Sequence, residues 1–218
     1  MKTGFRAIRC ARSWEKNRLE QEASRLDEGR LYAEQVAQLY QPLLLSVAAT
    51  LVGIALFAVA QWDVVSQAKV LLWVSIVTGV TLLRVVLAIA YHRASGPVES
   101  ARLWGGLFVF GAGMAGVAWG VGGILMFPAG NIEHQVMLVL VILGICAGAT
   151  TTLSVVPLAA YLFLVPAMLP VTALFVSSGH RVSVVVGRML LLSFGFFLSR
   201  TRHTYRSSRQ NILLRMAA

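Results

Sequence analysis

The sequence predicts an all-α integral membrane protein: a helical bundle with six transmembrane helices and cytoplasmic N-terminal and C-terminal helices. Three observations support this prediction. Hydrophobic residues make up 57% of the 218 residues, charged residues only 13%, and the mean hydropathy is +0.74. The apolar residues gather in runs long enough to cross roughly 30 Å of hydrocarbon. Lysines and arginines gather between alternate runs and at both ends of the chain.

Residues 1–40 are predicted to form a cytoplasmic amphipathic segment, because they hold eight Lys/Arg and six Asp/Glu. No short apolar run with a small-residue cleavage site follows the first basic residues, and the acidic residues are ones that mitochondrial presequences avoid. We therefore expect neither targeting peptide. Leu19, Leu26, Ala33 and Tyr40 repeat every seven residues. This heptad is short, and such a stripe packs on a membrane surface or on its own bundle more often than in a coiled coil.

Residues 41–199 are predicted to form the six-helix transmembrane domain. No charged residue lies between Val136 and Gly179, and this stretch is too long for one straight span. Pro157 cannot continue a helical hydrogen-bond ladder, so the chain is expected to turn just before it. The spans are predicted at Pro42–Gln61, Val70–Tyr91, Leu103–Phe127, Val136–Leu153, Val155–Val176 and Val182–Leu198.

The distribution of basic residues predicts the orientation of the spans. The loops at one side hold Lys69 and Arg181, whereas Arg93 and Arg102 lie between the second and third spans at the other side. That richer side also holds the arginines after the last span, which are Arg200, Arg202, Arg206, Arg209 and Arg215. Cytoplasmic loops are the ones rich in Lys and Arg. Both termini are therefore predicted to be cytoplasmic.

Residues 200–218 are predicted to form a basic cytoplasmic exit helix. Ile212, Leu213 and Met216 share one side of this helix, and most of its arginines lie elsewhere. An apolar stripe on a helix outside the membrane needs a partner that covers it.

Small residues recur every four positions in two predicted spans. Ala112, Gly116 and Gly120 share one face of the third span, and Gly144 and Gly148 share one face of the fourth. Small residues at this spacing let helix backbones approach closely, so all five are candidate helix-packing residues. The pattern fits either a homodimer seam or packing within the bundle, and the second is the more common outcome.

Arg84 and Arg188 are the only charges well inside the predicted spans. An intramembrane charge is a candidate functional site by default, and the alternative is a long side chain that reaches the nearer interface. Arg84 is the stronger candidate, because Thr78 and Thr81 share its helix.

Prolines and threonines predict an irregular region in the fourth and fifth spans. Pro166 and Pro170 lie one helical turn apart and are expected to kink the fifth span. Irregular backbone at membrane depth is tolerated where it is buried or lines a cavity. A ligand-free kinked bundle is the alternative to a small ligand pocket. The candidate ligand or signalling residues are therefore Arg84, Thr150, Thr151, Thr152, Pro166 and Pro170.

Signatures of catalysis and of cofactor binding are missing from the sequence. We find no Walker loop, nucleophile elbow, HExxH or CxxC motif, so no catalytic residue and no cofactor is predicted. Glu133, His134 and His180 do not have the spacing that marks a metal site. The net charge of +10 is better explained by Lys and Arg at membrane edges than by nucleic-acid binding, because no aromatic–basic interleaving accompanies it.

Three stretches carry a family resemblance: AEQVAQLYQPLLLSVAATLV at the start of the first span, GVAWGVGGILMFPAGNIEHQVMLVLVILGICAGA through the third and fourth, and VVPLAAYLFLVPAMLP in the fifth. Together they resemble the six-span N-terminal membrane domain of many proteobacterial sensory proteins. The resemblance covers about residues 30–218 and lies in spacing more than in identity. In that family, the last span leads through a short helix into a GGDEF diguanylate cyclase domain or a histidine kinase. The matching positions are Trp119-Gly120, Phe127-Pro128, His134-Gln135, Gly144 to Gly148, Pro157, Tyr161, Pro166 and Pro170.

The resemblance implies a sensory input module in the bacterial inner membrane, a homodimer with a cytoplasmic signalling partner. None of the matching positions is catalytic, and the 218 residues hold no output domain, so no enzymatic activity is carried over. Two alternatives stay open. A small transporter subunit would need an internal repeat or paired broken helices, and no clear repeat is visible. A membrane scaffold would bind partner proteins through its glycine faces.

Overall fold

The computed structural model describes residues 29, 31–94, 100–128, 130–179 and 181–217, and within them all regular structure is helical. A helical segment, Leu31–Tyr40, precedes the first long helix. The long helices are α2 (Leu43–Gln61), α3 (Gln67–Ala94), α4 (Ala101–Leu125), α5 (Ile132–Leu153), α6 (Pro157–Ser177) and α7 (Arg181–Ala217).

The six long helices form a closed ring. Around it, α2 contacts α3, α3 contacts α4, α4 contacts α6, α6 contacts α7, α7 contacts α5, and α5 contacts α2. Helix α5 also contacts α6 across the ring, as extensively as it contacts α7. The most extensive interface joins α4 and α6, whereas α4 and α5, consecutive in the chain, touch at only a few positions. The ring therefore does not follow chain order: α5 lies between α2 and α7, and α6 is inserted beside α4.

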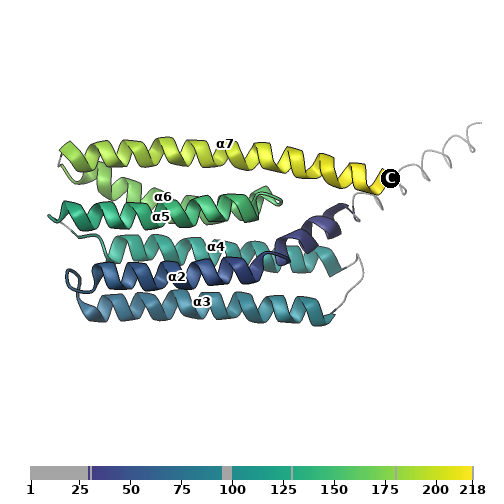
Figure 1. The fold of residues 1–218 in the computed structure, drawn as a ribbon, viewed down its shortest axis with the longest axis horizontal. Helices are drawn as coiled ribbons and strands as arrows, with labels where there is room; N and C mark the ends of the chain where they lie inside the picture. Colours follow the sequence, from purple (N-terminus) through teal and green to yellow (C-terminus); the bar gives the residue numbers. More distant parts are fainter. Residues whose placement is uncertain (1–28, 30, 95–99, 129, 180, 218) are drawn as a thin grey trace, which may run out of the picture.

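Successive helices run back and forth along the bundle, as Figure 1 shows. The segment Leu31–Tyr40 and the C-terminal part of α7 lie at the same end. The short connections before α3, α5 and α7 lie at the opposite end. This arrangement places both described ends of the chain on one side, as an even number of spans requires.

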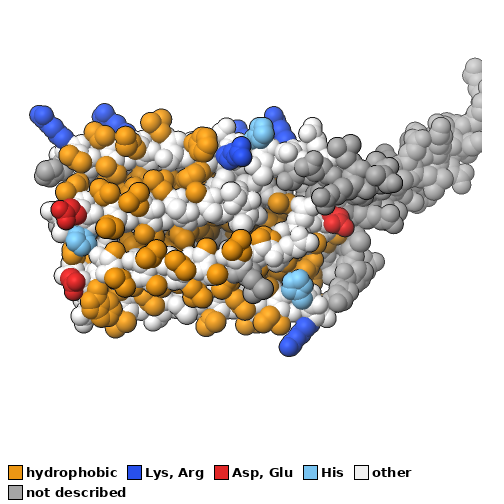
Figure 2. All heavy atoms as spheres, in the orientation of Figure 1, with side chains coloured by type: hydrophobic (Ala, Val, Ile, Leu, Met, Phe, Trp, Pro, Cys, Tyr) orange, Lys and Arg blue, Asp and Glu red, His pale blue; other side chains and the backbone are white. Residues whose placement is uncertain are grey.

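Five helices are long and apolar enough to cross a membrane: α3, α4, α5, α6 and the part of α7 from Arg181 to Ser207. A sixth candidate span is formed by α2 together with Leu31–Tyr40, from which it is bent by 41°. Large apolar side chains such as Leu45 and Leu192 are 73% and 76% exposed, and Figure 2 shows apolar side chains over the middle of one face with charges toward its ends. The prediction of an all-α bundle is confirmed, and five or six of its helical segments are candidate membrane spans by length and composition.

The predicted turn between the fourth and fifth spans is present. Helix α5 ends at Leu153, and α6 begins at Pro157, whose missing N–H is tolerated in the first helical turn. Pro166 and Pro170 both lie inside α6, which continues through them to Ser177.

Helix α7 is one helix of 37 residues from Arg181 to Ala217. At 1.5 Å per residue it is about 55 Å long, whereas the hydrocarbon is only about 30 Å thick. The last predicted span and the exit helix at residues 200–218 are therefore a single continuous helix. The side chains of Ile212, Leu213 and Met216 lie outside the described part of the structure, as do Leu19 and Leu26 of the N-terminal heptad.

An aromatic cluster fills the core between α2, α3 and α4. The ring of Trp73 makes edge contacts with Phe57 and Trp119, with centroids 5.1 Å apart in each pair. The indole Nε1 of Trp73 donates a hydrogen bond to the carbonyl oxygen of Ala118 at 3.0 Å. All three rings are almost fully buried, so the cluster joins three neighbouring helices of the ring.

Candidate functional site

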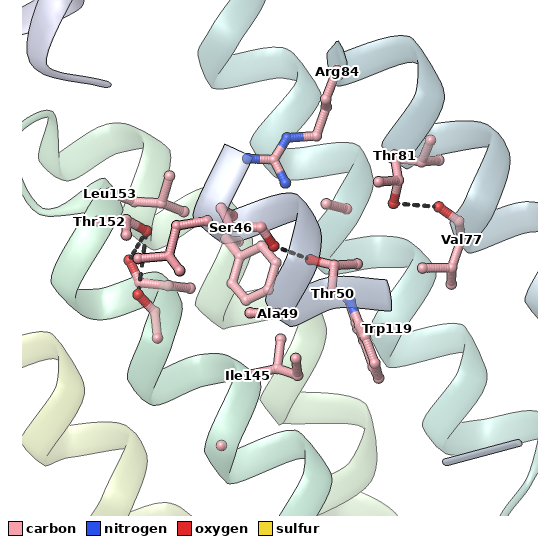
Figure 3. A pocket seen from close by; sticks show the side chains of 17 residues that line it. Ser46, Ala49, Thr50, Val77, Thr81, Arg84, Trp119, Ile145, Thr152 and Leu153 are labelled. Atoms are coloured by element: carbon pink, nitrogen blue, oxygen red, sulfur yellow. Dashed lines mark hydrogen bonds between the residues drawn. The ribbon is translucent and has the colours of Figure 1, made fainter. Parts of the chain in front are cut away.

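A cavity of about 220 Å³ lies between α2, α3, α4 and α5, and Phe163 of α6 also lines it. Figure 3 shows it from close by, with Arg84 reaching from α3 toward Ser46 of α2. Most of its wall is apolar, and Val77, Trp119 and Phe163 are buried members of that wall. The polar side chains that line it are Ser46, Thr50, Thr81, Arg84 and Thr152.

Arg84 is the cation in this wall. Its guanidinium carbon lies 5.8 Å from the centroid of the Phe108 ring, within the range of a cation–π contact. Among the described residues, the Arg84 guanidinium has neither a hydrogen bond nor a carboxylate at ion-pair distance. A guanidinium carries five N–H donors and no acceptor. Its donors are therefore available to a molecule in the cavity.

The threonines around the cavity already donate their hydroxyl protons. Thr50 donates to the carbonyl oxygen of Ser46 at 2.8 Å, Thr81 to that of Val77 at 2.7 Å, and Thr152 to that of Gly148 at 3.2 Å. Such bonds to the preceding helical turn are a common way to place hydroxyls inside a membrane helix. The threonine oxygens keep only acceptor capacity, so the free N–H donors of the cavity belong to Arg84.

One side of the cavity is thinly covered. Gly144 and Gly148 of α5 line it, and an added Cβ at either glycine would meet nothing within 4 Å. Both glycines are exposed, as are Leu45 and Ala49 of α2 across the seam. The seam between α2 and α5 is therefore a window from the apolar outer surface into the cavity.

The structure brings some of the sequence-predicted residues together and separates others. Arg84, Thr152, Gly144 and Gly148 share the cavity. Thr150 is buried and bonds to its own helix, and Thr151 is exposed and does the same. The remaining predicted residues, Pro166, Pro170, Ala112, Gly116 and Gly120, do not line this cavity.

Two polar residues of the cavity, Ser46 and Thr50 of α2, were not predicted from the sequence. They lie four residues apart, so they share one face of an otherwise apolar helix. This spacing was a usable signal. Trp119 was noticed only as a matching position in the family resemblance, because an apolar span gives no indication of which aromatic ring faces a cavity.

The small residues of α4 are used inside the bundle. Ala112 is buried, and Gly116 and Gly120 lie against the backbone of α6, at Phe163 and Pro166. A Cβ at either glycine would overlap that backbone. This face of α4 is therefore covered by α6 within one chain.

A chain of aromatic rings connects Arg84 with the end of the bundle. The Phe108 ring under Arg84 makes an edge contact with Tyr40, at 5.1 Å between centroids. Tyr40 stacks on Tyr91 at 4.0 Å, and its hydroxyl donates to the carbonyl oxygen of Trp104 at 3.2 Å. Tyr40 is the last residue of the helical segment Leu31–Tyr40. Arg84 is therefore connected through the Phe108 ring and the Tyr40 ring to the bend before α2.

A second polar cluster lies at the opposite end of the bundle. Gln135 of α5 donates to the carbonyl oxygen of Pro128 at 3.2 Å and accepts a hydrogen bond from the Ser183 hydroxyl at 2.9 Å. Gln135 and Ser183 are buried, so this pair fixes the start of α7 to α5. In the part of the chain that the structure describes, no three His, Cys, Asp or Glu side chains gather as a metal site.

Comparison with known proteins gives no relative. No family model matches the chain, and no significant match was found among the curated proteins or among the solved structures. The length and hydropathy of its helices place the chain in the class of multi-span helical membrane proteins.

Proposed function

We propose that this chain is a membrane-embedded input module of a bacterial signal-transduction protein. The module passes a change in the bundle through α7 to a cytoplasmic output of the diguanylate cyclase or histidine kinase type. The observation that supports this best is the continuity of α7 from Arg181 to Ala217. This helix is about 25 Å longer than the hydrocarbon is thick, so it joins the transmembrane bundle directly to a segment outside the membrane.

The position of α7 suits a relay. It packs on α5 and on α6, and α5 supplies six residues of the cavity wall. A ligand that binds one arrangement of α5 better than another shifts the population of that arrangement. Because α7 lies against α5 and is fixed to it by Gln135 and Ser183, the shift reaches the part of α7 outside the membrane.

The orientation proposed for the module follows from charge. The end of α3 with Arg93, the start of α4 with Arg102 and the later part of α7 with Arg200 and Arg202 lie at the end of the bundle from which α7 extends. The starts of α3 and α7, with Lys69 and Arg181, lie at the other end. By the positive-inside rule, the arginine-rich end faces the cytoplasm. Both termini are then cytoplasmic, in the bacterial inner membrane.

Pairing of α7 extensions in a homodimer tests the proposal. Cys10 and Cys146 are replaced with alanine, and Ile212→Cys and Leu213→Cys are made singly and oxidised in native membranes. We expect disulfide-linked dimers at one or both positions, because the apolar stripe of the extension needs a partner. Ser207→Cys, an exposed position of α7 on the side of the helix away from Ile212, Leu213 and Met216, is the control and should stay monomeric.

Monomers at both positions would contradict the homodimer and with it this form of relay. A transporter subunit predicts another result, uptake of a solute by vesicles that contain the purified protein. Uptake by these vesicles, absent from protein-free ones, would replace the sensory proposal.

A further inference from the structure

We propose that the cavity at Arg84 binds a small carboxylate amphiphile, with the carboxylate at the guanidinium and the apolar body along the wall formed by α3 and α4. The binding site is argued from the geometry of the cavity. Only its role as the stimulus of the input module rests on the proposed function.

The first argument is the charge. A cation in an apolar surrounding is costly unless an anion or strong acceptors pair with it. In the described part of the chain, Arg84 has one ring contact, with Phe108, and no paired carboxylate. A carboxylate supplies the missing charge and matches the planar fork of a guanidinium with two parallel hydrogen bonds.

The second argument is the set of free hydrogen-bonding groups. Thr50 and Thr81 donate their protons to their own helices, so neither competes with Arg84 as a donor to the ligand. The Ser46 hydroxyl lines the cavity and makes no hydrogen bond to another described residue, so it is free to donate as well. A ligand head group that pairs with the Arg84 and Ser46 donors must therefore offer hydrogen-bond acceptors, and it does not have to donate.

The third argument is the wall and the entrance. Val77, Trp119 and Phe163 give the interior an apolar surface that a hydrocarbon chain fills favourably. The volume of about 220 Å³ holds a short chain and excludes a whole phospholipid. The window at Gly144 and Gly148 opens onto the apolar outer surface, so the ligand enters from the bilayer rather than from water. An amphiphile fits the apolar wall with its hydrocarbon chain and can reach the window through the bilayer.

The test uses the full chain in phosphatidylcholine nanodiscs at pH 8. The probe is 8-bromooctanoate, whose bromine quenches tryptophan fluorescence on contact, and Trp119 lines the cavity. We expect saturable quenching by 8-bromooctanoate and only weak, linear quenching by 8-bromo-1-octanol, which partitions into the disc but lacks the charge. Absence of saturation, or equal quenching by the alcohol, would overturn the proposal.

Matched variants locate the binding. Arg84→Gln should weaken binding about tenfold or more, because charge-assisted hydrogen bonds are lost. Arg188→Gln, which removes an exposed arginine from α7, should leave it unchanged. Equal affinity of Arg84→Gln and the unmodified protein would place the probe elsewhere and overturn the site.

A second pair of variants keeps the test decisive if Arg84→Gln does not fold. Gly148→Val places a branched side chain in the window, and an added Cβ there meets nothing within 4 Å, so the neighbouring helices leave room for it. Gly195→Val, which is equally unobstructed but lies on α7, is the control. We expect weaker binding in the first variant only; unchanged binding in Gly148→Val would overturn the site.

The source of the carboxylate is decided by the same assay. Replacing part of the phosphatidylcholine with oleic acid raises the apparent Kd of the probe more than the same fraction of anionic phosphatidylglycerol does, if a membrane fatty acid occupies the site. Adding octanoate to the aqueous phase does so if a free short-chain acid binds. Competition by either supports the shared carboxylate chemistry, and competition by neither overturns it. Probe binding without any change in cross-linking of α7 would retain the site and refute its role as the stimulus.

Discussion

The backbone carbonyl oxygen of Pro166 lies against Gly120, at the place where any other residue would carry its Cβ. Pro170 explains why this oxygen is free: it has no N–H, so the carbonyl four residues earlier lacks its helical hydrogen-bond partner. Glycine lets the two backbones approach, and a Cα–H donor then faces the free carbonyl. The prolines of α6 and the glycines of α4 are thus two sides of one interface.

The first prediction concerns that interface. Gly120→Ala should lower the free energy of unfolding by about 1–3 kcal/mol, because the new methyl group overlaps the backbone of α6 and cannot be relieved by a rotamer change. Gly106→Ala is the control on the same helix, where an added Cβ meets nothing within 4 Å. The measurement is thermal unfolding in detergent, followed by circular dichroism. Equal stability of the two variants would contradict the described contact.

The second prediction concerns the aromatic core. Trp73→Phe removes the hydrogen bond from Nε1 to the carbonyl oxygen of Ala118 and leaves unfilled space beside Gly122. We expect a loss of stability of about 1–3 kcal/mol, from the hydrogen bond and the cavity together. Trp62→Phe is the matched control, because Trp62 is 40% exposed. Similar melting temperatures for the two variants would show that Trp73 is not the core residue described.

The third prediction concerns the start of α7. Ser183→Ala removes the donor to Gln135 and leaves a buried amide oxygen unsatisfied, at a cost of about 1–3 kcal/mol. Ser75→Ala removes a hydroxyl that bonds only to its own helix, at Leu71, and should cost much less. Hydrogen exchange of the first turns of α7 distinguishes the two. Unchanged protection there in Ser183→Ala would argue against the fixing role of this pair.

The fourth prediction concerns the bend before α2. Tyr40→Phe loses only the hydroxyl bond to Trp104, at about 0.5–1.5 kcal/mol, and keeps the stack on Tyr91. Tyr40→Ala also loses both ring contacts and should cost about 3–5 kcal/mol, the range for a large buried aromatic side chain. Limited proteolysis near residues 31–40 follows the release of this segment. If Tyr40→Phe released it as readily as Tyr40→Ala, the hydroxyl rather than the stack would hold it.

Some features were predictable from the sequence because they depend on local properties. The helices and the turn before Pro157 follow from the length of apolar runs and from the missing N–H of proline, and the structure has both. Arg84 was identified as a candidate because a charge inside a span is visible without any knowledge of its neighbours.

Other features depend on contacts between helices that are distant in the chain. Hydropathy does not indicate that α4 packs on α6 rather than on α5, since every span is apolar on most sides. The two glycine pairs have the same spacing in the sequence but different surroundings in the structure. Gly116 and Gly120 pack against the backbone of α6, whereas Gly144 and Gly148 line the cavity and face open space.

The sequence by itself determined that this protein is a bundle of apolar helices with an arginine inside two of them, because chain composition fixes how each segment partitions between water and hydrocarbon. Only the tertiary structure decided the ring order, the cavity around Arg84 and the window beside it. These features depend on which glycines pack against the backbone of a neighbouring helix and which face open space. Packing across the bundle decides this for each glycine.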